Sequence, residues 1–567
     1  MQSWLKEKIA AHVPGTEFEI HIPPDPALGD YATNVAFICA KAEHKSPLDV
    51  AHDIISRLKQ DTDIAEKFGN IQAAAPGFIN FFFKPEFLQK KFATLSAQRE
   101  KLGTSSDGVG KTVIVESSSP NIAKAMHIGH LRSTIIGDAL ANMFALRGYR
   151  VIRWNYLGDW GTQFGKLIAA YKLWGNKEEL AADPIGAMQK LYVRFHDEMK
   201  NNPDLEKRGQ EEFKKLESGD GENRHLWTWF RDESLQEFQK IYDILGVQFD
   251  VMKGESDYEK DLSPLIDDLK KRNLVRESEG ALIAEPDGLP PAIVQKSDQA
   301  TLYFTRDLAT LHERLTEYYP DVILYVVANQ QALHFEQLFS FARKKLGWDS
   351  AQLAHIKFGM VLGSDRKKLA TREGNAIALE DVIEEVTERT RKIIQKKNPE
   401  LSEKEKEEVA EIVGIGALKY NDLKEFRTSD IVFDWDRMLD LTGNSGPYLQ
   451  YTYARLRSIW RKAGWMDKLF FRPDATELTD TLELALIKHL LNFSDAIALG
   501  MRQYATSGVA LYLYELANLA SRYYETVRIL SDDNRGRRHA RLALIGTVAT
   551  VLKQGLGILG MQTLEEI

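Results

Sequence analysis

Residues 111–155 decide the fold, and they read KTVIVESSSPNIAKAMHIGHLRSTIIGDALANMFALRGYRVIRWN. The β-branched run at 111–116 is typical of a buried parallel strand. Residues 127–146 carry apolar side chains at helical spacing, and Gly148 is suited to end that helix. A second strand is expected at 149–155. This strand–helix–strand order predicts the nucleotide-binding half of an α/β, doubly wound sheet.

The whole chain divides into three predicted domains. Residues 1–100 mix short helices and strands, which predicts an α+β domain, and a linker rich in Ser, Gly and charge follows at 96–111. Residues 110–390 form the α/β domain, with a charged helical insertion around 166–245. Residues 391–567 are nearly all helical and predict an all-α bundle. Further strands of the α/β domain are expected at 281–284, 292–294 and 322–327.

Composition limits the class of protein. The 567 residues carry a net charge of −8 and are 44% hydrophobic, as in soluble globular proteins. Cys39 is the sole cysteine, which argues against a disulfide framework and favours a reducing, cytoplasmic location. We find no run of about 18 apolar residues and expect no membrane span. Residues 446–567 hold 15 Lys and Arg against 12 Asp and Glu, so they are a weak candidate for a polyanion surface, with a solvated helical face as the alternative.

The sequence His127-Ile-Gly-His130 opens the predicted helix soon after the first strand. A helix N-terminus offers unpaired N–H groups and a partial positive charge, which suit a phosphate. Gly129 lets a ring approach the backbone, both imidazoles can donate hydrogen bonds to phosphate oxygens, and Lys124 adds a full charge. A zinc site at the two histidines lacks a nearby third ligand. Residues 108–112 resemble the end of a P-loop, but they precede a strand instead of following one.

Here the sequence resembles the class I aminoacyl-tRNA synthetases, whose HIGH motif matches residues 127–130. The longer stretch from 118 to 165 looks like the arginine-specific members of that class. The resemblance continues in DYATNVAF and PGFINFF near the N-terminus, in GNSGPYLQYTYAR at 443–455 and in RLALIGTVATVLKQGLGILGM at 541–561. It implies an N-terminal domain that contacts the tRNA elbow, a catalytic core, and a C-terminal bundle that binds the anticodon.

The resemblance also implies an ATP site. The second class I signature, KMSK, corresponds to residues 368–371, which read KLAT, so Thr371 stands where the second lysine is usual. In this family the lysine before HIGH is thought to substitute, and Lys124 occupies that position. Arg372 and Lys367 are further candidates. The implied ATP-binding residues are Lys124, His127, Gly129, His130, Lys368 and Arg372. ATP is expected as a substrate with Mg²⁺, and no structural metal is expected.

Arginine recognition needs groups that match a planar, charged guanidinium, namely carboxylates and an aromatic face. Tyr303 and Asp307 are four residues apart, so they share one face if the segment is helical. The resemblance implies that Tyr303, Asp307 and Gln331 line the amino-acid pocket. It places Glu116 and Asn121 near the α-amino end of the substrate. Glu255 is a further acidic candidate for the same pocket.

The implied partners are tRNA(Arg), L-arginine and ATP, with no membrane, and the chain is expected to be a monomer. Candidate tRNA contacts lie in the first and last domains: Tyr31, Asn80, Phe82, Tyr451, Arg455, Tyr523 and Arg528. Some aromatic residues of the tail must be core, and others could stack on anticodon bases. Two alternatives remain open. The chain could adenylate another amino acid, or it could be a non-catalytic RNA-binding descendant of a synthetase.

Overall fold

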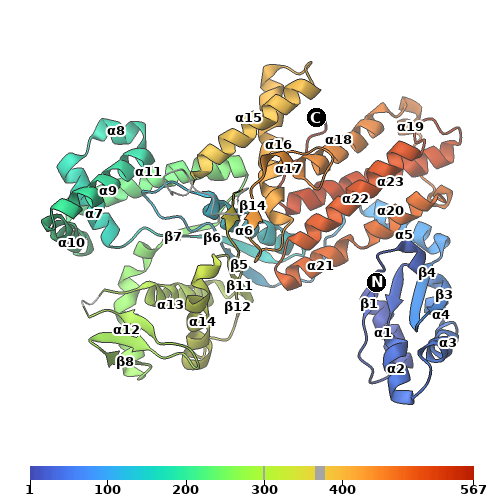
Figure 1. Ribbon diagram of the computed structural model, residues 1–567, viewed down its shortest axis with the longest axis horizontal. Helices are drawn as coiled ribbons and strands as arrows, with labels where there is room; N and C mark the ends of the chain where they lie inside the picture. Colours follow the sequence, from blue (N-terminus) through green and yellow to red (C-terminus); the bar gives the residue numbers. More distant parts are fainter. Residues whose placement is uncertain (298–299, 364–376, 567) are drawn as a thin grey trace.

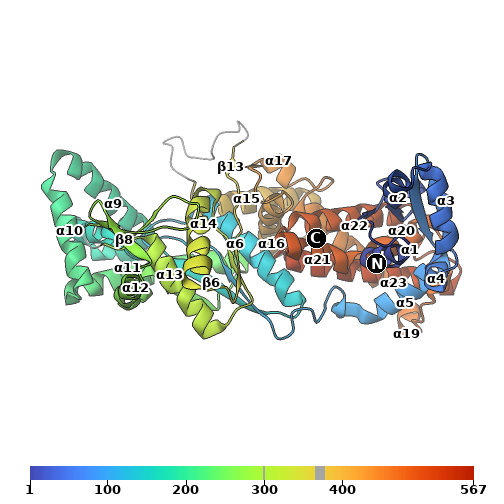
Figure 2. The same ribbon diagram turned by 90° about the horizontal axis from the view of Figure 1, so that it is seen from below.

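The computed structural model describes residues 1–297, 300–363 and 377–566 of the chain. The molecule is elongated, with an α/β core near its centre (Figure 1). A helical insertion lies at one end of the long axis, and the N-terminal domain lies at the other end, beside a helical bundle (Figure 2). Lys367, Lys368 and Arg372, predicted in the lysine loop, lie outside the described residues.

The core is a five-stranded parallel sheet in the order β12-β11-β5-β6-β7. Its strands are β5 (Thr112–Glu116), β6 (Arg150–Leu157), β7 (Val251–Gly254), β11 (Val322–Tyr325) and β12 (Gln352–His355). The strands expected at 111–116, 149–155 and 322–327 are confirmed. The edge strands β7 and β12, of four residues each, were not expected from the sequence.

The strand order reverses at β5. From β5 the chain moves through β6 to β7, and it later returns on the other side of β5 as β11 and β12. In doubly wound sheets, ligands bind outside the carboxyl ends of the strands at such a switch point. The carboxyl ends of β5 and β11 lie side by side, because Glu116 is in register with Tyr325. A ligand is therefore expected at the loops that follow these two strands.

Helix α6 (Ile128–Leu146) follows β5 and is buried on nearly every face. It contacts β5 and β6 of the sheet. Four helices of the C-terminal half also contact it: α15 (Leu379–Lys397), α16 (Glu403–Leu423), α21 (Phe493–Gln503) and α23 (Arg535–Ile558). This explains why the helix is apolar all round instead of along one stripe. Gly148 has a φ of +85°, and a Cβ there would lie 3.1 Å from the carbonyl oxygen of Ser105. Glycine suits this helix end for both reasons.

Buried ionic contacts join the core to the C-terminal half. Arg132 of α6 lies 2.8 Å from Asp422, and both side chains are almost fully buried. Lys419 Nζ donates to the carbonyl oxygens of Leu245 and Gly560, each at 2.5 Å. These carbonyls belong to the end of the helical insertion and to the end of the last helix. Losing one partner of a buried ion pair costs about 3–5 kcal/mol, so the Arg132–Asp422 contact helps to fix the bundle on the core.

The chain between β6 and β7 is helical, as expected for residues 166–245. Its helices are α7 (Thr162–Trp174), α8 (Lys177–Ala182), α9 (Pro184–Asn201), α10 (Asp204–Glu217) and α11 (Gly221–Leu245). They project from the core to one end of the molecule (Figure 1).

The sheet has a different cover on each face. Ile114 of β5 packs with α12 (Glu259–Lys271), α13 (Tyr303–Glu313) and α14 (Ala332–Phe341), whereas Val113 and Val115 pack with α6 on the other face. This alternation follows from the two-residue period of a strand. A small antiparallel sheet completes the first cover: β8 (Val275–Ser278), β9 (Ala281–Ala284) and β10 (Ala292–Gln295). The strands expected at 281–284 and 292–294 therefore belong to this separate sheet.

The N-terminal domain is α+β, as predicted. Its antiparallel sheet has the order β1-β2-β4-β3, formed by β1 (Ile20–His21), β2 (Tyr31–Thr33), β3 (Phe68–Ala74) and β4 (Phe78–Phe83). The helices α1 (Gln2–His12), α2 (Val35–Glu43), α3 (Pro47–Leu58) and α4 (Thr62–Lys67) accompany it. Helix α5 (Pro85–Gln98) then runs to the bundle, where it contacts α20 (Thr481–Leu491) and α23. The predicted linker at 96–111 thus begins inside α5.

The C-terminal part is a helical bundle. Its helices are α15 (Leu379–Lys397), α16 (Glu403–Leu423), α17 (Trp435–Met438), α18 (Gly446–Lys462), α19 (Trp465–Leu469), α20 (Thr481–Leu491), α21 (Phe493–Gln503), α22 (Ser507–Thr526) and α23 (Arg535–Ile558). A short parallel pair, β13 (Val361–Leu362) and β14 (Ile431–Val432), joins the bundle to the core. The domain boundary expected at 390/391 falls inside α15.

Two stretches of the bundle, Thr481–Gln503 and Arg535–Ile558, are long and apolar enough to cross a membrane by length and composition. Charged residues such as Lys488 and Lys553 interrupt the two stretches, so neither is an unbroken run of about 18 apolar residues, and the expectation that no such run exists stands. Both stretches contribute side chains to the packed core, for example Leu486 and Val548, each 0% exposed. A core helix passes the same test, so the two stretches are weak evidence for a membrane.

Candidate active site at the carboxyl edge of the sheet

The N-terminus of α6 is closed by its two histidines. His127 is the N-cap residue, and its Nδ1 accepts a hydrogen bond from the Gly129 N–H at 3.1 Å. His130 Nδ1 accepts one from the His127 N–H at 3.0 Å, and the two rings stack with centroids 3.9 Å apart. This is a capping box made by imidazoles. Because each Nδ1 is an acceptor, a neutral ring carries its proton on Nε2.

Burial and the neighbouring His127 lower the pKa of His130 to about 3. Its ring is therefore neutral near pH 7 and offers one N–H donor, not a full charge. A Cβ at residue 129 would lie 2.9 Å from His127 Cε1, so Gly129 leaves room for the His127 ring to fold back onto the helix end. A full positive charge must come from another side chain.

Lys124 provides a positive charge beside this helix end. It is exposed, and its Nζ lies 5.4 Å from the ring centroid of Tyr192 on α9. A cavity of about 290 Å³ separates this part of α9 from the loop before α6. Its lining residues come from both elements and from the start of α15: Ala123, Lys124, Ala125, Met126, His127, Gln189, Tyr192, Val193 and Ala378. The segment that follows the lysine loop docks here, because the Leu379 N–H donates to the Met126 carbonyl at 2.8 Å.

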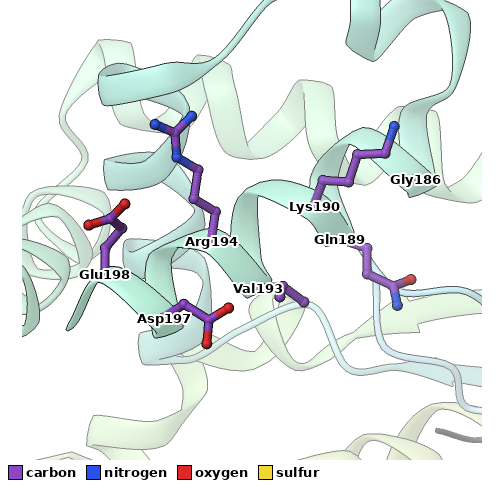
Figure 3. A pocket seen from close by; sticks show the side chains of 7 residues that line it. All are labelled: Gly186, Gln189, Lys190, Val193, Arg194, Asp197 and Glu198. Carbon is purple, nitrogen blue, oxygen red and sulfur yellow. The ribbon is translucent and has the colours of Figure 1, made fainter. Parts of the chain in front are cut away.

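A second, shallower depression follows α9 outward. Gln189 and Val193 line both, so the two adjoin. Figure 3 shows Gln189, Val193 and Asp197 along one side of α9, with Arg194 and Glu198 on a neighbouring side. The surface is therefore mixed in charge. It offers no strong field for either sign of partner.

The arginine candidates gather on the other side of the same sheet edge. Glu116, the last residue of β5, is 4% exposed and pairs with the fully buried Arg314. The Arg314 guanidinium lies 4.5 Å from the Trp154 ring centroid and 5.2 Å from that of Tyr325. Burial raises the pKa of Glu116, and Arg314 opposes this shift. Glu116 thus already has a cationic partner inside the protein, so its predicted role near the α-amino group stays a prediction.

Glu255 and Asp307 form the acidic part of the site. Glu255 follows β7 directly and is 7% exposed. Burial raises its pKa to about 8, with nearby Asp307 and Asp159 adding to the effect and Arg306 opposing it. Asp307 on α13 lies 2.6 Å from His334 Nε2. Carboxyl groups crowded at a buried edge in this way favour the binding of a cation.

The other predicted arginine residues lie near the same edge but are open to solvent. Tyr303 begins α13 and is 68% exposed. Its ring is one turn from Asp307, and the negative charge of Glu255 adds to burial in raising its pKa. Gln331 ends the turn after β11, and Asn121 bridges to Gly158 after β6. All these residues follow carboxyl ends of strands or start α13, which begins at that edge.

The predicted tRNA contacts are divided by burial. Phe82 is half-buried, whereas Tyr451, Arg455 and Arg528 are exposed. Tyr31 and Asn80, at 3% and 6% exposed, are buried in the N-terminal domain, which weighs against direct contact with RNA.

The prediction that Tyr523 contacts tRNA needs correction. The Tyr523 ring is fully buried in the bundle core, and its hydroxyl donates to Glu483 at 3.1 Å. The ring has no free face on which a base could stack. The aromatic character of the tail alone could not reveal this.

Sequence reasoning missed Arg314, His334 and Arg306. Arg306 donates to the Glu255 carbonyl at 3.1 Å and to Thr301 Oγ1 at 3.3 Å. Arg306 and Arg314 share the segment with Asp307, and a buried arginine near several acids is a usable signal. His334 lies three residues after Gln331, but its partner is 27 residues away, so no local pattern joins them.

The fold and the site define a class of protein. A doubly wound sheet with HIGH at the switch point is the arrangement expected of a class I synthetase, and a family model described as tRNA synthetases class I (R), catalytic domain, matches residues 92–435. Models described as Arginyl tRNA synthetase N terminal domain and DALR anticodon binding domain match residues 2–83 and 449–567.

Known proteins narrow the class to one family. A protein of Clostridium perfringens named arginine–tRNA ligase is 43% identical over 99% of this chain and 98% of its own length. One of Streptococcus suis with the same name is 42% identical over 99% of both chains. The crystal structure of arginyl-tRNA synthetase from Plasmodium falciparum superposes with a TM-score of 0.84, at 27% identity, covering 100% of this chain and 98% of the other. The chain therefore belongs to the arginyl-tRNA synthetase family, as its sequence motifs indicated.

Proposed function

We propose that this chain joins L-arginine to the 3′-terminal adenosine of tRNA(Arg) and spends ATP in doing so, releasing AMP and pyrophosphate. One observation carries the proposal. The acidic edge at Asp307 and Glu255 and the capped N-terminus of α6 lie at the carboxyl ends of the same parallel sheet. A cationic amino acid and an anionic nucleotide can therefore meet there.

In the first step, the arginine carboxylate attacks the α-phosphate of ATP, and the bond to the β-phosphate breaks. ATP enters with Mg²⁺ on its phosphates as the usual substrate form. The Nε2–H groups of the two imidazoles donate hydrogen bonds to oxygens that gain charge, the partial positive charge of the α6 N-terminus stabilises them, and Lys124 supplies a full charge. Lys368, Lys367 and Arg372 are the candidates of the lysine loop for the leaving pyrophosphate.

In the second step, a ribose hydroxyl of the terminal adenosine attacks the carbonyl carbon of the adenylate. The hydroxyl proton is lost and AMP leaves. The N-terminal domain and the bundle would hold the tRNA, with Phe82, Tyr451, Arg455 and Arg528 as exposed candidates. We also propose a cytoplasmic monomer, with a first domain boundary near residue 100.

A charging assay with purified chain, ATP, total tRNA and a panel of radiolabelled amino acids tests the proposal. Arginine alone should be transferred to acid-precipitable tRNA. Transfer of a different amino acid would favour the alternative of another adenylating ligase. ATP–pyrophosphate exchange with tRNA present separates the last alternative, because a non-catalytic RNA-binding protein would bind tRNA and show no exchange.

A further inference from the structure

His334 lies in the first turn of α14 and reaches across to α13. Its Nε2 is 2.6 Å from Asp307 Oδ2, and both side chains are about four-fifths buried, with 19% and 18% of their surfaces exposed. The His334 ring meets Phe304 and Phe335 edge-on, with centroids 6.5 Å and 5.3 Å away. These contacts hold the imidazole in place. A donor whose position is fixed can in turn fix the orientation of the carboxylate that accepts its hydrogen bond.

An aspartate on a helix needs such a partner to keep one orientation. Its terminal torsion has broad, roughly two-fold wells, so the plane of the carboxylate turns easily. A guanidinium makes two parallel hydrogen bonds only with a carboxylate in its own plane. The oxygen that accepts from His334 keeps a second lone pair, and Oδ1 keeps both of its own. Asp307 can therefore be fixed by His334 and still receive a bidentate guanidinium.

The other charged groups at this edge explain why the partner is a histidine. Arg314 pairs with Glu116, and Arg306 donates to the Glu255 carbonyl and to Thr301. Each of the two buried arginines is thus engaged elsewhere. The single N–H of His334 Nε2 engages one oxygen of Asp307 and leaves the other free for the substrate, whereas the fork of an arginine partner could occupy both oxygens.

We propose that His334 is a positioning residue that sets the plane of the Asp307 carboxylate for the substrate guanidinium. The inference rests on the proposed function, because it takes Asp307 as the residue that receives arginine. His334 acts on arginine only through Asp307. Its loss should therefore affect arginine binding and leave the ATP side of the reaction nearly unchanged.

The test measures tRNA charging with five variants of the full chain. His334→Ala should raise the KM for arginine about tenfold, equal to about 1.4 kcal/mol, with kcat and the KM for ATP changed less than about threefold. His334→Gln keeps an N–H at a similar reach and should restore most of the affinity. The double variant His334→Ala/Asp307→Asn should match Asp307→Asn alone, because residues that act through one contact are not additive. His312→Ala, an exposed histidine on α13, is the matched control and should behave as wild type.

Several outcomes would overturn the inference. An unchanged arginine KM in His334→Ala, alongside a raised KM in Asp307→Asn, means that Asp307 needs no such partner. Full additivity in the double variant means that His334 acts by another route. The residue only stabilises the fold if three results occur together. The kcat falls and the KM values for arginine and ATP rise by similar factors, the melting temperature falls, and His334→Gln rescues none of these changes. An unchanged KM in Asp307→Asn would instead refute the arginine site of the proposed function.

Discussion

The capping box of α6 allows catalysis and folding to be separated at one residue, His130. Its Nδ1 accepts the His127 N–H at 3.0 Å, which leaves Nε2 as the proton-bearing donor. Asn has an oxygen where His has Nδ1, so His130→Asn keeps the cap and removes the donor. Leu has neither group, so His130→Leu loses both the donor and the cap.

The two variants should fail in different ways. Losing one preorganised donor to developing charge costs roughly 2.7–4 kcal/mol, so His130→Asn should lower kcat for charging about 10²- to 10³-fold. Its melting temperature should stay close to that of the wild type. Losing a helix cap costs about 0.5–2 kcal/mol, so His130→Leu should lose stability by about that amount as well as losing the rate.

Charging of tRNA under saturating arginine and ATP gives kcat, and chemical denaturation gives the free energy of unfolding. The burial that lowers the pKa of His130 to about 3 also predicts no loss of rate from protonation of this ring between pH 6 and 8. A folded His130→Asn enzyme that charges tRNA at the wild-type rate would refute the catalytic role of Nε2.

The remaining predictions concern the acid edge, the lysines and the bundle. Burial raises the pKa of Glu255 to about 8, so a cationic arginine should displace its proton. The KM for arginine should therefore fall as pH rises from 6 to 8.5 in the wild type, and it should not fall in Glu255→Gln. Because this folded-state pKa lies above the unfolded value of about 4.3, the same group stabilises the empty fold at low pH, and that contribution is lost as pH rises through 8. Lys124→Ala should reduce charging at least as much as Lys368→Ala, and a near-normal Lys124→Ala beside an inactive Lys368→Ala would contradict the substitution idea. A chain truncated near residue 440 should lose useful tRNA charging, and circular dichroism and ATP binding distinguish loss of the bundle from unfolding of the core. Arg528→Glu should weaken the apparent affinity for tRNA and make that affinity less dependent on salt.

The sequence could predict the centre of the fold because its signals are local. The strand β5 is a β-branched run, α6 has helical spacing and HIGH sits between them, so each element is specified by neighbours in the chain. The edge strand β12 reads QLAH, which has no β-branched residue and is strand only because β11 pairs with it. Its existence depends on the tertiary structure, and a window of four residues cannot contain that information.

The site residues show the same difference between what local sequence predicts and what depends on the tertiary structure. Glu116, Asp307 and Glu255 could be named from family motifs, but their partners could not. Arg314 pairs with Glu116 across 198 residues of sequence, and only the folded sheet brings them together. Aromatic residues of the bundle show the same limit: Tyr451 and Tyr523 are alike in sequence, yet one is 39% exposed and the other is in the core.

The covering of α6 by α21 and α23 has a consequence for how the chain is made. Helix α6 is complete by residue 146, but its last neighbour, α23, ends only at Ile558. At about 5–20 residues per second, a ribosome needs roughly 20–80 seconds to cover that interval. During this time the apolar outer face of α6 lacks part of its native cover. Nascent chains of this protein should therefore depend on chaperones that shield the half-built core, and ribosome stalling in the bundle should send them to aggregation or proteolysis.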